Sequence, residues 1–321
     1  MSARWNRFWF SPAPVLDLAI LRILFVGFQV FWLLPLPFTH DTLGQLARHA
    51  AMPAEAWTPL PVLQLLMLPF GGGRPSLEFL HVVWAVSLLA GVLGLIGLFT
   101  NVALIVFAAG NVLLQAFAYS FVHDVHHREA AMMIALTALA LSPCAKVLAI
   151  DAWRQRRARG AARPTLDQVL AMKDPMARWP IKLIHLIFVL MYISAVYAKL
   201  WAGGLDWANG YTLQYNLATD GMRWGSDFSV WLSQFHWLAV FASWSVLIFQ
   251  GTFWMTLLFP KLKWIYVPIG MAFHVGIYVT LRAPFWQWMV LYAVFIPWTA
   301  ALRLWLGRDA RSSEAVGVAA E

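Results

Sequence analysis

Long apolar runs constrain this chain more than any other feature of its sequence. Several stretches of about 20 residues are almost entirely apolar, for example 77–98 and 101–121. Because a bilayer core offers the backbone no hydrogen-bond partner, only helices and closed barrels can span it. The chain is 61% hydrophobic and 12% charged, and soluble domains carry about 25% charged residues. We therefore expect an all-α fold, a polytopic integral membrane helical bundle.

The apolar runs predict eight transmembrane helices in one domain over 1–308. The expected spans are 15–36, 77–98, 101–121, 129–150, 179–201, 232–258, 264–282 and 285–306. Residues 37–76 form a long first loop, in which the short apolar piece 61–70 is interfacial or re-entrant. Residues 151–178 are a basic linker, and 309–321 is a disordered tail.

The distribution of lysine and arginine predicts the orientation. Most of them fall on pieces that share one side of the membrane if both termini are cytoplasmic, above all on 154–163. Cytoplasmic loops of membrane proteins carry this excess. The net charge of +8 is then explained by topology and contact with anionic lipid, so we expect no nucleic acid partner.

Lys199 is the first candidate for chemistry, because ionisable groups in membrane helices are costly and often functional. It lies near the outer end of the fifth expected span. His185, Tyr192 and Lys199 are spaced by seven residues, so they share a helix face to within a modest drift. Burial favours the neutral form of a lysine and makes it a base. The alternative is a lysine that snorkels to the outer headgroups.

Histidines are the second group of candidates. His123, His126 and His127 begin the fourth expected span, with a spacing that resembles one histidine box of the membrane di-iron desaturases. Those enzymes combine several such boxes, whereas the other histidines here stand alone. We therefore expect a polar cluster at a helix start and no metal. His274, near the middle of the seventh span, is either a structural hydrogen-bonding residue or part of a site.

Two charges in the first span, Asp17 and Arg22, have a structural interpretation. Their spacing allows only imperfect pairing. We expect Arg22 to fix helix packing through hydrogen bonds to carbonyls or loop groups.

Around Lys199 the sequence resembles the vitamin K-dependent γ-carboxylases. Their pattern Y-x-x-A-x-x-x-K-L, followed by D-W-x-x-G-Y, is matched over 192–200 and 206–211. Pieces at 21–27 and 273–274, and the start of the fourth span, agree in order and position. The wider group is the horizontally transferred transmembrane domain (HTTM) family, which includes many bacterial proteins. The resemblance covers most of the chain and implies a multi-pass protein of a bacterial inner membrane.

The resemblance also implies residue roles. In the carboxylases the matching lysine deprotonates reduced vitamin K, oxygen generates a stronger base, and CO2 adds to a substrate glutamate. By position, Lys199 takes the role of the base and His127, or less directly His126, assists it. His274 matches a family histidine. The residues expected to bind substrate at the outer face are His126, His274, Tyr192, Trp207, Tyr211 and Arg282.

Departures from the family narrow the expected activity. Ala198 stands where the carboxylases have a second lysine, and two extra residues fall within 201–204. Cys144 is the one cysteine, so no intrachain disulfide can form. We expect no counterpart of the large lumenal portion of the carboxylases. These differences argue against protein γ-carboxylation but are compatible with a pocket for a quinol.

The first hypothesis is therefore a membrane enzyme, a quinol-dependent carboxylase-like or epoxidase-like lyase. Lys199 would act as a base on reduced vitamin K or menaquinone, with O2 and CO2, or on another lipidic substrate. The alternative is a non-enzymatic membrane partner of another protein, in maturation, immunity or secretion. A small-molecule transporter is the third possibility.

Overall fold

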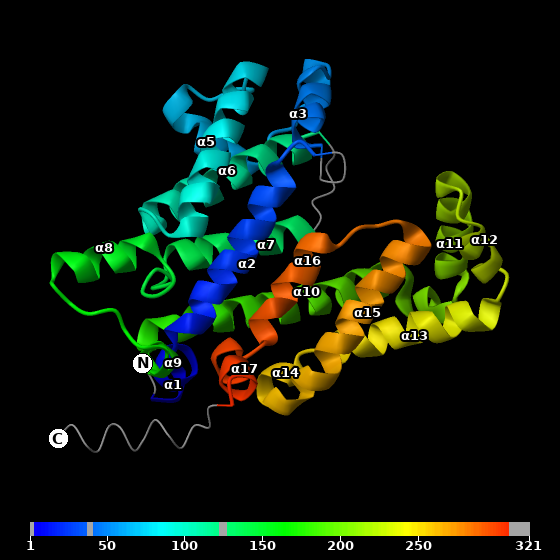
Figure 1. Ribbon diagram of the computed structural model, residues 1–321. Helices are drawn as coiled ribbons and strands as arrows, with labels where there is room; N and C mark the ends of the chain where they lie inside the picture. Colours follow the sequence, from blue (N-terminus) through cyan, green and yellow to red (C-terminus); the bar gives the residue numbers. More distant parts are fainter. Residues whose placement is uncertain (1–2, 37–40, 122–126, 308–321) are drawn as a thin grey trace. The chain divides into compact units, whose positions relative to one another are not determined.

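The computed structural model describes residues 3–36, 41–121 and 127–307 (Figure 1). These residues are helical apart from turns, loops and one pair of two-residue strands, β1 (Ala13–Pro14) and β2 (Lys173–Asp174). The expected all-α fold is thereby confirmed. The chain divides into two compact units. Unit 1 comprises Met1–Ile184 and Ile296–Glu321, and unit 2 comprises His185–Phe295.

Among the described residues, six helices are long and apolar enough to cross a membrane. They are α2 (Val15–Leu33), α5 (Leu77–Ile96), α6 (Thr100–Tyr119), α10 (Arg178–Gly203), α13 (His236–Thr252) continued by α14 (Met255–Leu258), and α15 (Lys263–Leu281). In α5 the exposed side chains Val82, Val86, Leu89 and Ile96 recur at helical spacing. A continuous apolar stripe of this kind requires lipid or protein around it, as in a multi-pass membrane protein.

Two of the expected spans differ from the structure. The fourth was expected over 129–150, but α7 (His127–Ala140) ends at Ala140 and turns and bends follow up to residue 149. The eighth was expected over 285–306, but it is interrupted at residues 296 and 297 between η6 (Tyr292–Phe295) and α17 (Trp298–Trp305). Pro297 accounts for the interruption, because proline has no N–H to donate within a helix.

Short helices fill regions that the sequence analysis treated as loops and linkers. The first loop contains α3 (Thr42–Ala50), η1 (Ala54–Ala56), α4 (Pro61–Met67) and η2 (Leu68–Phe70). The basic region 151–178 contains α8 (Ile150–Ala158), α9 (Leu166–Ala171) and η3 (Pro175–Ala177). The first described helix is α1 (Ala3–Phe10). The expected tail 309–321 lies outside the described residues.

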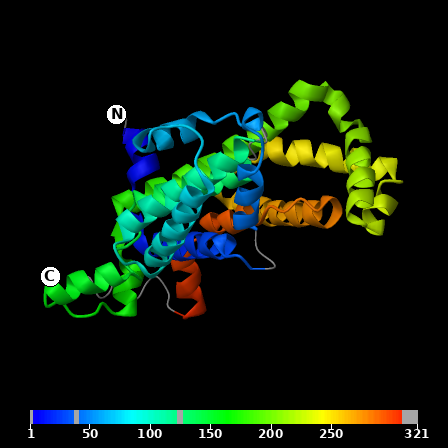
Figure 2. The same ribbon diagram turned by 90° about the horizontal axis from the view of Figure 1, so that it is seen from above.

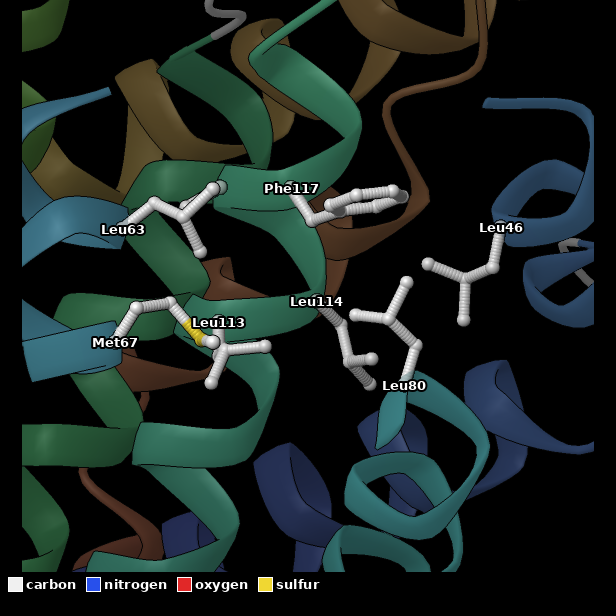
Figure 3. Close-up of a cluster of buried hydrophobic side chains, with 8 residues drawn as sticks. Leu46, Leu63, Met67, Leu80, Leu113, Leu114 and Phe117 are labelled. Atoms are coloured by element: carbon white, nitrogen blue, oxygen red, sulfur yellow. The ribbon is translucent and has the colours of Figure 1, made fainter. Parts of the chain in front are cut away.

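In unit 1, α3 and α4 pack against α5 and α6. Their shared core is drawn in Figure 3, where Leu46 of α3, Leu63 of α4 and Leu80 of α5 gather around Phe117 of α6. The side chains of Leu63, Leu80 and Phe117 are completely buried. Helices α5 and α6 also run beside each other, as both views show (Figures 1 and 2).

The charges of α2 have separate partners. Arg22 is fully buried, and its Nη2 donates a hydrogen bond to the carbonyl oxygen of Leu148, in the segment between α7 and α8. The expected bond from Arg22 to a loop carbonyl is therefore confirmed. Asp17 accepts hydrogen bonds from the backbone N–H and the hydroxyl of Thr299, at 2.7 and 2.6 Å, and so caps the start of α17.

Asp151 ties the start of α8 to the turn between α5 and α6. Its carboxylate accepts hydrogen bonds from the N–H groups of Phe99 and Thr100, at 3.0 and 2.7 Å, and from the Thr100 hydroxyl. Burial by itself would raise the pKa of Asp151, but these hydrogen bonds outweigh it and hold the pKa below its usual value.

Substitution of Asp151 by asparagine should therefore destabilise the protein in a pH-dependent way. A carboxyl whose pKa is lowered by folding stabilises the protein above its unfolded pKa of about 3.9 and loses this contribution as the pH falls through the folded pKa. We expect Asp151→Asn to lose about 1–2 kcal/mol near pH 7. Melting temperatures of the detergent-solubilised protein should differ at pH 7 and converge below pH 4.

The matched control is Asp227→Asn, which changes an exposed carboxylate of α12 (Asp227–Leu232). It should shift the melting temperature little at either pH. A gap between wild type and Asp151→Asn that is as large below pH 4 as at pH 7 would contradict this account.

Unit 2 is built on the part of α10 that follows Ile184. The other elements are η4 (Gly204–Asn209), α11 (Tyr211–Trp224), α12, α13, α14, η5 (Pro260–Leu262), α15, α16 (Trp286–Leu291) and η6. Its core is aromatic: the ring of Phe188 packs against Phe253, Trp288 and Phe295, with centroids 4.4 to 6.1 Å apart.

Candidate functional site

Lys199 is held near the end of α10 by two uncharged acceptors. Its Nζ donates to the carbonyl oxygen of Ala195 and to Oε1 of Gln250, each at 3.1 Å. The same nitrogen lies 5.3 Å from the centroid of the Trp207 ring. Gln250, on α13, is 5% exposed, whereas Lys199 is partly buried. Within the described part of the chain, no carboxylate forms an ion pair with Lys199.

Glycines set the position of Trp207. Helix α10 ends at Gly203, and Gly204 has φ +56°, so the chain turns directly after the helix. Gly210 has φ +89°, and a Cβ atom there would lie 2.8 Å from the backbone nitrogen of Val240. Glycine is therefore required where η4 meets α13. These turns bring the indole of Trp207 back over the amine.

Seven residues before Lys199, Tyr192 is the centre of a buried polar cluster. Its hydroxyl lies 3.2 Å from His274 Nε2, accepts a hydrogen bond from Trp288 Nε1 at 3.3 Å, and shares a hydrogen bond with the Tyr292 hydroxyl. All four side chains are at most 4% exposed. They come from α10, α15, α16 and η6, of which the three α-helices are labelled in Figure 1.

The donors and acceptors of this cluster fit one consistent arrangement. A tyrosine hydroxyl donates one hydrogen bond and can accept two. If Tyr192 accepts hydrogen bonds from Trp288 and Tyr292, its own hydroxyl donates to His274 Nε2. Tyr292 then donates to Tyr192, and Tyr192 donates to His274. Buried hydrogen bonds of this kind, between side chains of different helices, help to fix how the helices pack.

The structure brings together some of the expected site residues. The amine of Lys199 lies over the Trp207 ring, and the hydroxyl of Tyr192 is hydrogen-bonded to His274. His185, the third member of the expected stripe, stacks on Phe295 and lies 3.2 Å from the carbonyl oxygen of Val294.

Two other expected substrate-binding residues make different contacts. The exposed Tyr211 ring packs on His236, with centroids 4.5 Å apart. Arg282 ends α15 and lies over the Tyr278 ring, 5.9 Å from its centroid. His126 is outside the described residues, and of His127 only the backbone, at the start of α7, is described. Assistance by either histidine stays a prediction.

Gln250, Trp288 and Tyr292 are not among the residues expected from the sequence. Gln250 carried a signal, since an amide within an apolar helix is expensive and usually has a partner. Trp288 and Tyr292 gave no such signal, because membrane proteins place many Trp and Tyr residues at the two interfaces.

An apolar hollow of about 180 Å³ lies elsewhere in unit 2. It is lined by Leu213, Leu217, Leu232, Leu238, Ala239, Phe241 and Ala242, from α11, α12 and α13. None of these residues hydrogen-bonds to Lys199 or Tyr192 among the contacts described above.

Removing the hydroxyl of Tyr192 should destabilise unit 2. In Tyr192→Phe, the buried polar groups of Tyr292, Trp288 and His274 each lose one partner, and a buried group left short of a partner costs about 1–3 kcal/mol. We expect a total loss of about 2–4 kcal/mol, measured by thermal unfolding in detergent. Tyr197→Phe is the matched control on the same helix, where the side chain is 62% exposed. Equal melting temperatures for the two variants would contradict the role of the cluster.

Comparisons of the chain with protein-family models, with curated proteins and with solved structures find no match. The resemblance to the carboxylases therefore stays a prediction from short motifs.

Proposed function

We propose that the protein is a multi-pass membrane enzyme in which Lys199 acts as a base on a reduced quinone or a similar lipidic hydroxyl compound. One observation carries the proposal: both hydrogen-bond partners of the Lys199 amine are uncharged acceptors, Ala195 O and Gln250 Oε1. A lysine with a purely structural charge is commonly paired with a carboxylate when it is buried.

The arrangement suits an amine that accepts a proton. An uncharged lysine has two N–H bonds and one lone pair. The two acceptors can take both N–H bonds, which leaves the lone pair for the hydroxyl proton of a substrate. After proton transfer, the ammonium keeps both hydrogen bonds and is also stabilised by a cation–π interaction with the Trp207 ring.

The surroundings of Lys199 support a lipidic substrate. On the same stretch of α10, Tyr197 and Trp201 are 62% and 78% exposed, and their rings stack with centroids 5.7 Å apart. In a spanning helix such side chains face lipid or another hydrophobic molecule. A quinol offers the flat ring that aromatic side chains bind and the hydroxyl that an amine can deprotonate.

The proposal includes the topology from the sequence: eight crossings, with the interrupted α16–α17 segment as one of them, and both termini in the cytoplasm of a bacterium. Lys199 then lies near the outer face. Reduced vitamin K or menaquinone, with O2 and CO2, are the compounds that the motif resemblance implies.

Incubation of the purified protein with reduced menaquinone or reduced vitamin K tests the proposal. We expect quinone epoxide to form in the presence of O2 and not under anaerobic conditions. If a protein that still unfolds cooperatively forms no epoxide from either quinol, the enzymatic proposal fails. The alternative, a non-enzymatic membrane partner, would then be favoured, with the exposed side chains of Tyr215, Phe228 and Trp231 as contact surface.

A further inference from the structure

Helix α8 of unit 1 begins at the level of a membrane surface. The N–H of Asp151 donates to the carbonyl oxygen of Gly97 at 2.9 Å, and its carboxylate accepts from Phe99 and Thr100. Gly97–Phe99 is the turn between α5 and α6, two apolar helices of 20 residues each. Because each is long enough to cross a bilayer, the turn that joins them lies at one of its surfaces. Asp151 therefore fixes the start of α8 there, whichever surface it is.

Arginine and aromatic side chains share an exposed surface at this place. The guanidinium carbon of Arg154 lies 5.5 Å from the centroid of the Phe99 ring, and that of Arg157 lies 5.4 Å from the Trp153 ring. Phe99 and Trp153 are 60% and 42% exposed, and both arginines are exposed. We call these four residues the α8 surface.

The α8 surface has unbalanced positive charge. The carboxylate of Asp151, the acidic group of α8, hydrogen-bonds to the start of α6 and also interacts electrostatically with Arg154, but it can offset only one of the two arginine charges. Arg154 and Arg157 form no ion pair with another part of the described chain. Arg156 differs from them, because it donates to the carbonyl oxygen of Lys146 at 3.0 Å and so helps to hold the segment before α8.

We propose that the α8 surface binds the phosphate group of an anionic phospholipid. The two guanidinium groups supply charge and paired N–H donors for the phosphate, while the rings of Phe99 and Trp153 enter the boundary between headgroups and acyl chains. This inference is independent of the proposed function, because it uses no residue of unit 2.

The neighbouring side chains favour lipid over a soluble polyanion. Leu141 and Leu148, both in the segment between α7 and α8, are 61% and 54% exposed. Apolar groups beside basic groups at the end of spanning helices match the layered chemistry of a bilayer surface. A nucleic acid would engage the arginines and leave these leucines in water.

Lipid titration of the full chain in detergent micelles, followed by native mass spectrometry, tests the proposal. The probes are phosphatidylglycerol and phosphatidylcholine with identical acyl chains, and the readout is the apparent Kd of the first bound lipid. Wild-type protein should prefer phosphatidylglycerol. In Arg154→Gln/Arg157→Gln, the Kd for phosphatidylglycerol should rise about 30-fold. Each basic residue near an anionic lipid contributes ~1 kcal/mol to binding, and 1.4 kcal/mol corresponds to a tenfold change in Kd. The Kd for phosphatidylcholine should stay unchanged.

Two further variants test whether a loss of phosphatidylglycerol binding is specific to these two positions, or whether it follows from lower net charge or from misfolding. Arg48→Gln/Arg223→Gln removes the same charge from exposed positions on α3 and α11, and it should bind as wild type does. Arg154→Lys/Arg157→Lys keeps the charge but loses the paired N–H donors, so its Kd for phosphatidylglycerol should fall between that of wild type and that of Arg154→Gln/Arg157→Gln.

Three results would overturn the proposal. One is an equal loss of phosphatidylglycerol binding in the Arg48/Arg223 variant. Another is an unchanged Kd in Arg154→Gln/Arg157→Gln. The third is tighter binding of a single-stranded oligonucleotide, or of inorganic phosphate, than of phosphatidylglycerol through the same two arginines.

Discussion

Replacement of Lys199 by alanine should reduce the rate of quinol epoxidation by about 10²–10⁴-fold, the range in which a positioned general base contributes. The amine is the group that the proposal uses to take the hydroxyl proton, and alanine leaves nothing in its place. The measurement is epoxide formed from reduced menaquinone in O2 at saturating substrate. Since Lys199 is only partly buried, the fold should survive, which a melting curve checks.

Lys182→Ala and Gln250→Glu sharpen this test. Lys182 lies near the other end of the same helix, over the Phe8 ring, so its loss should leave the rate unchanged. Gln250→Glu puts a carboxylate where Oε1 now accepts from Lys199. It should hold the lysine as an ammonium and slow the reaction near neutral pH without loss of the side chain. A Lys199→Ala protein that works at the wild-type rate would remove the basis of the proposed chemistry.

Replacement of Gly91 by leucine should be the most damaging change to unit 1 among those considered. A Cβ atom at Gly91 would lie 2.6 Å from Val30 Cγ2 and 2.7 Å from Phe107 Cε2, so α5 approaches both α2 and α6 at this residue. Membrane helices pack closely through such small residues. Phe107 is fully buried and Val30 is 9% exposed, so neither has room to move. We expect a loss of about 3 kcal/mol or more, or roughly 6–12 °C in melting temperature.

Gly276→Leu is the matched control. Gly276 also lies within a spanning helix, α15, but a Cβ atom there meets nothing within 4 Å in the described structure. A leucine at this position should leave the melting temperature unchanged or raise it, because leucine has the higher helix propensity. If the two variants melt together, close packing of α5 is not what stabilises unit 1.

Hydropathy alone was enough to find the long helices. The six helices of spanning length begin and end near the expected residues, and the role of Arg22 followed from the need of a buried guanidinium for acceptors. Hydropathy failed for the short helices α3, α8 and α11. Each carries enough polar residues to resemble a loop. Asp41 caps α3, and α11 packs against α12 and α13.

The fourth and eighth expected spans show another limit of prediction from hydropathy. Residues 141–149 are apolar enough to continue α7, yet they turn, and Leu148 has φ +52° while its carbonyl oxygen takes the bond from Arg22. That bond joins residues 126 positions apart, so no local pattern could reveal it. Pro143 and Pro297, by contrast, were visible in the sequence and could have predicted the end of α7 and the interruption before α17.

For this protein, the sequence by itself determined that the chain is helical, that its long helices are apolar enough for a membrane, and that Tyr192 and Lys199 share one face of α10. These properties depend on the composition and spacing of residues within single helices. Only the tertiary structure decided the partners of that face, namely Gln250 for Lys199, and His274, Trp288 and Tyr292 for Tyr192. The reason is physical: a hydrogen bond between helices requires atoms to meet within about 3 Å, and where distant segments of a chain meet is set by the packing of the whole unit.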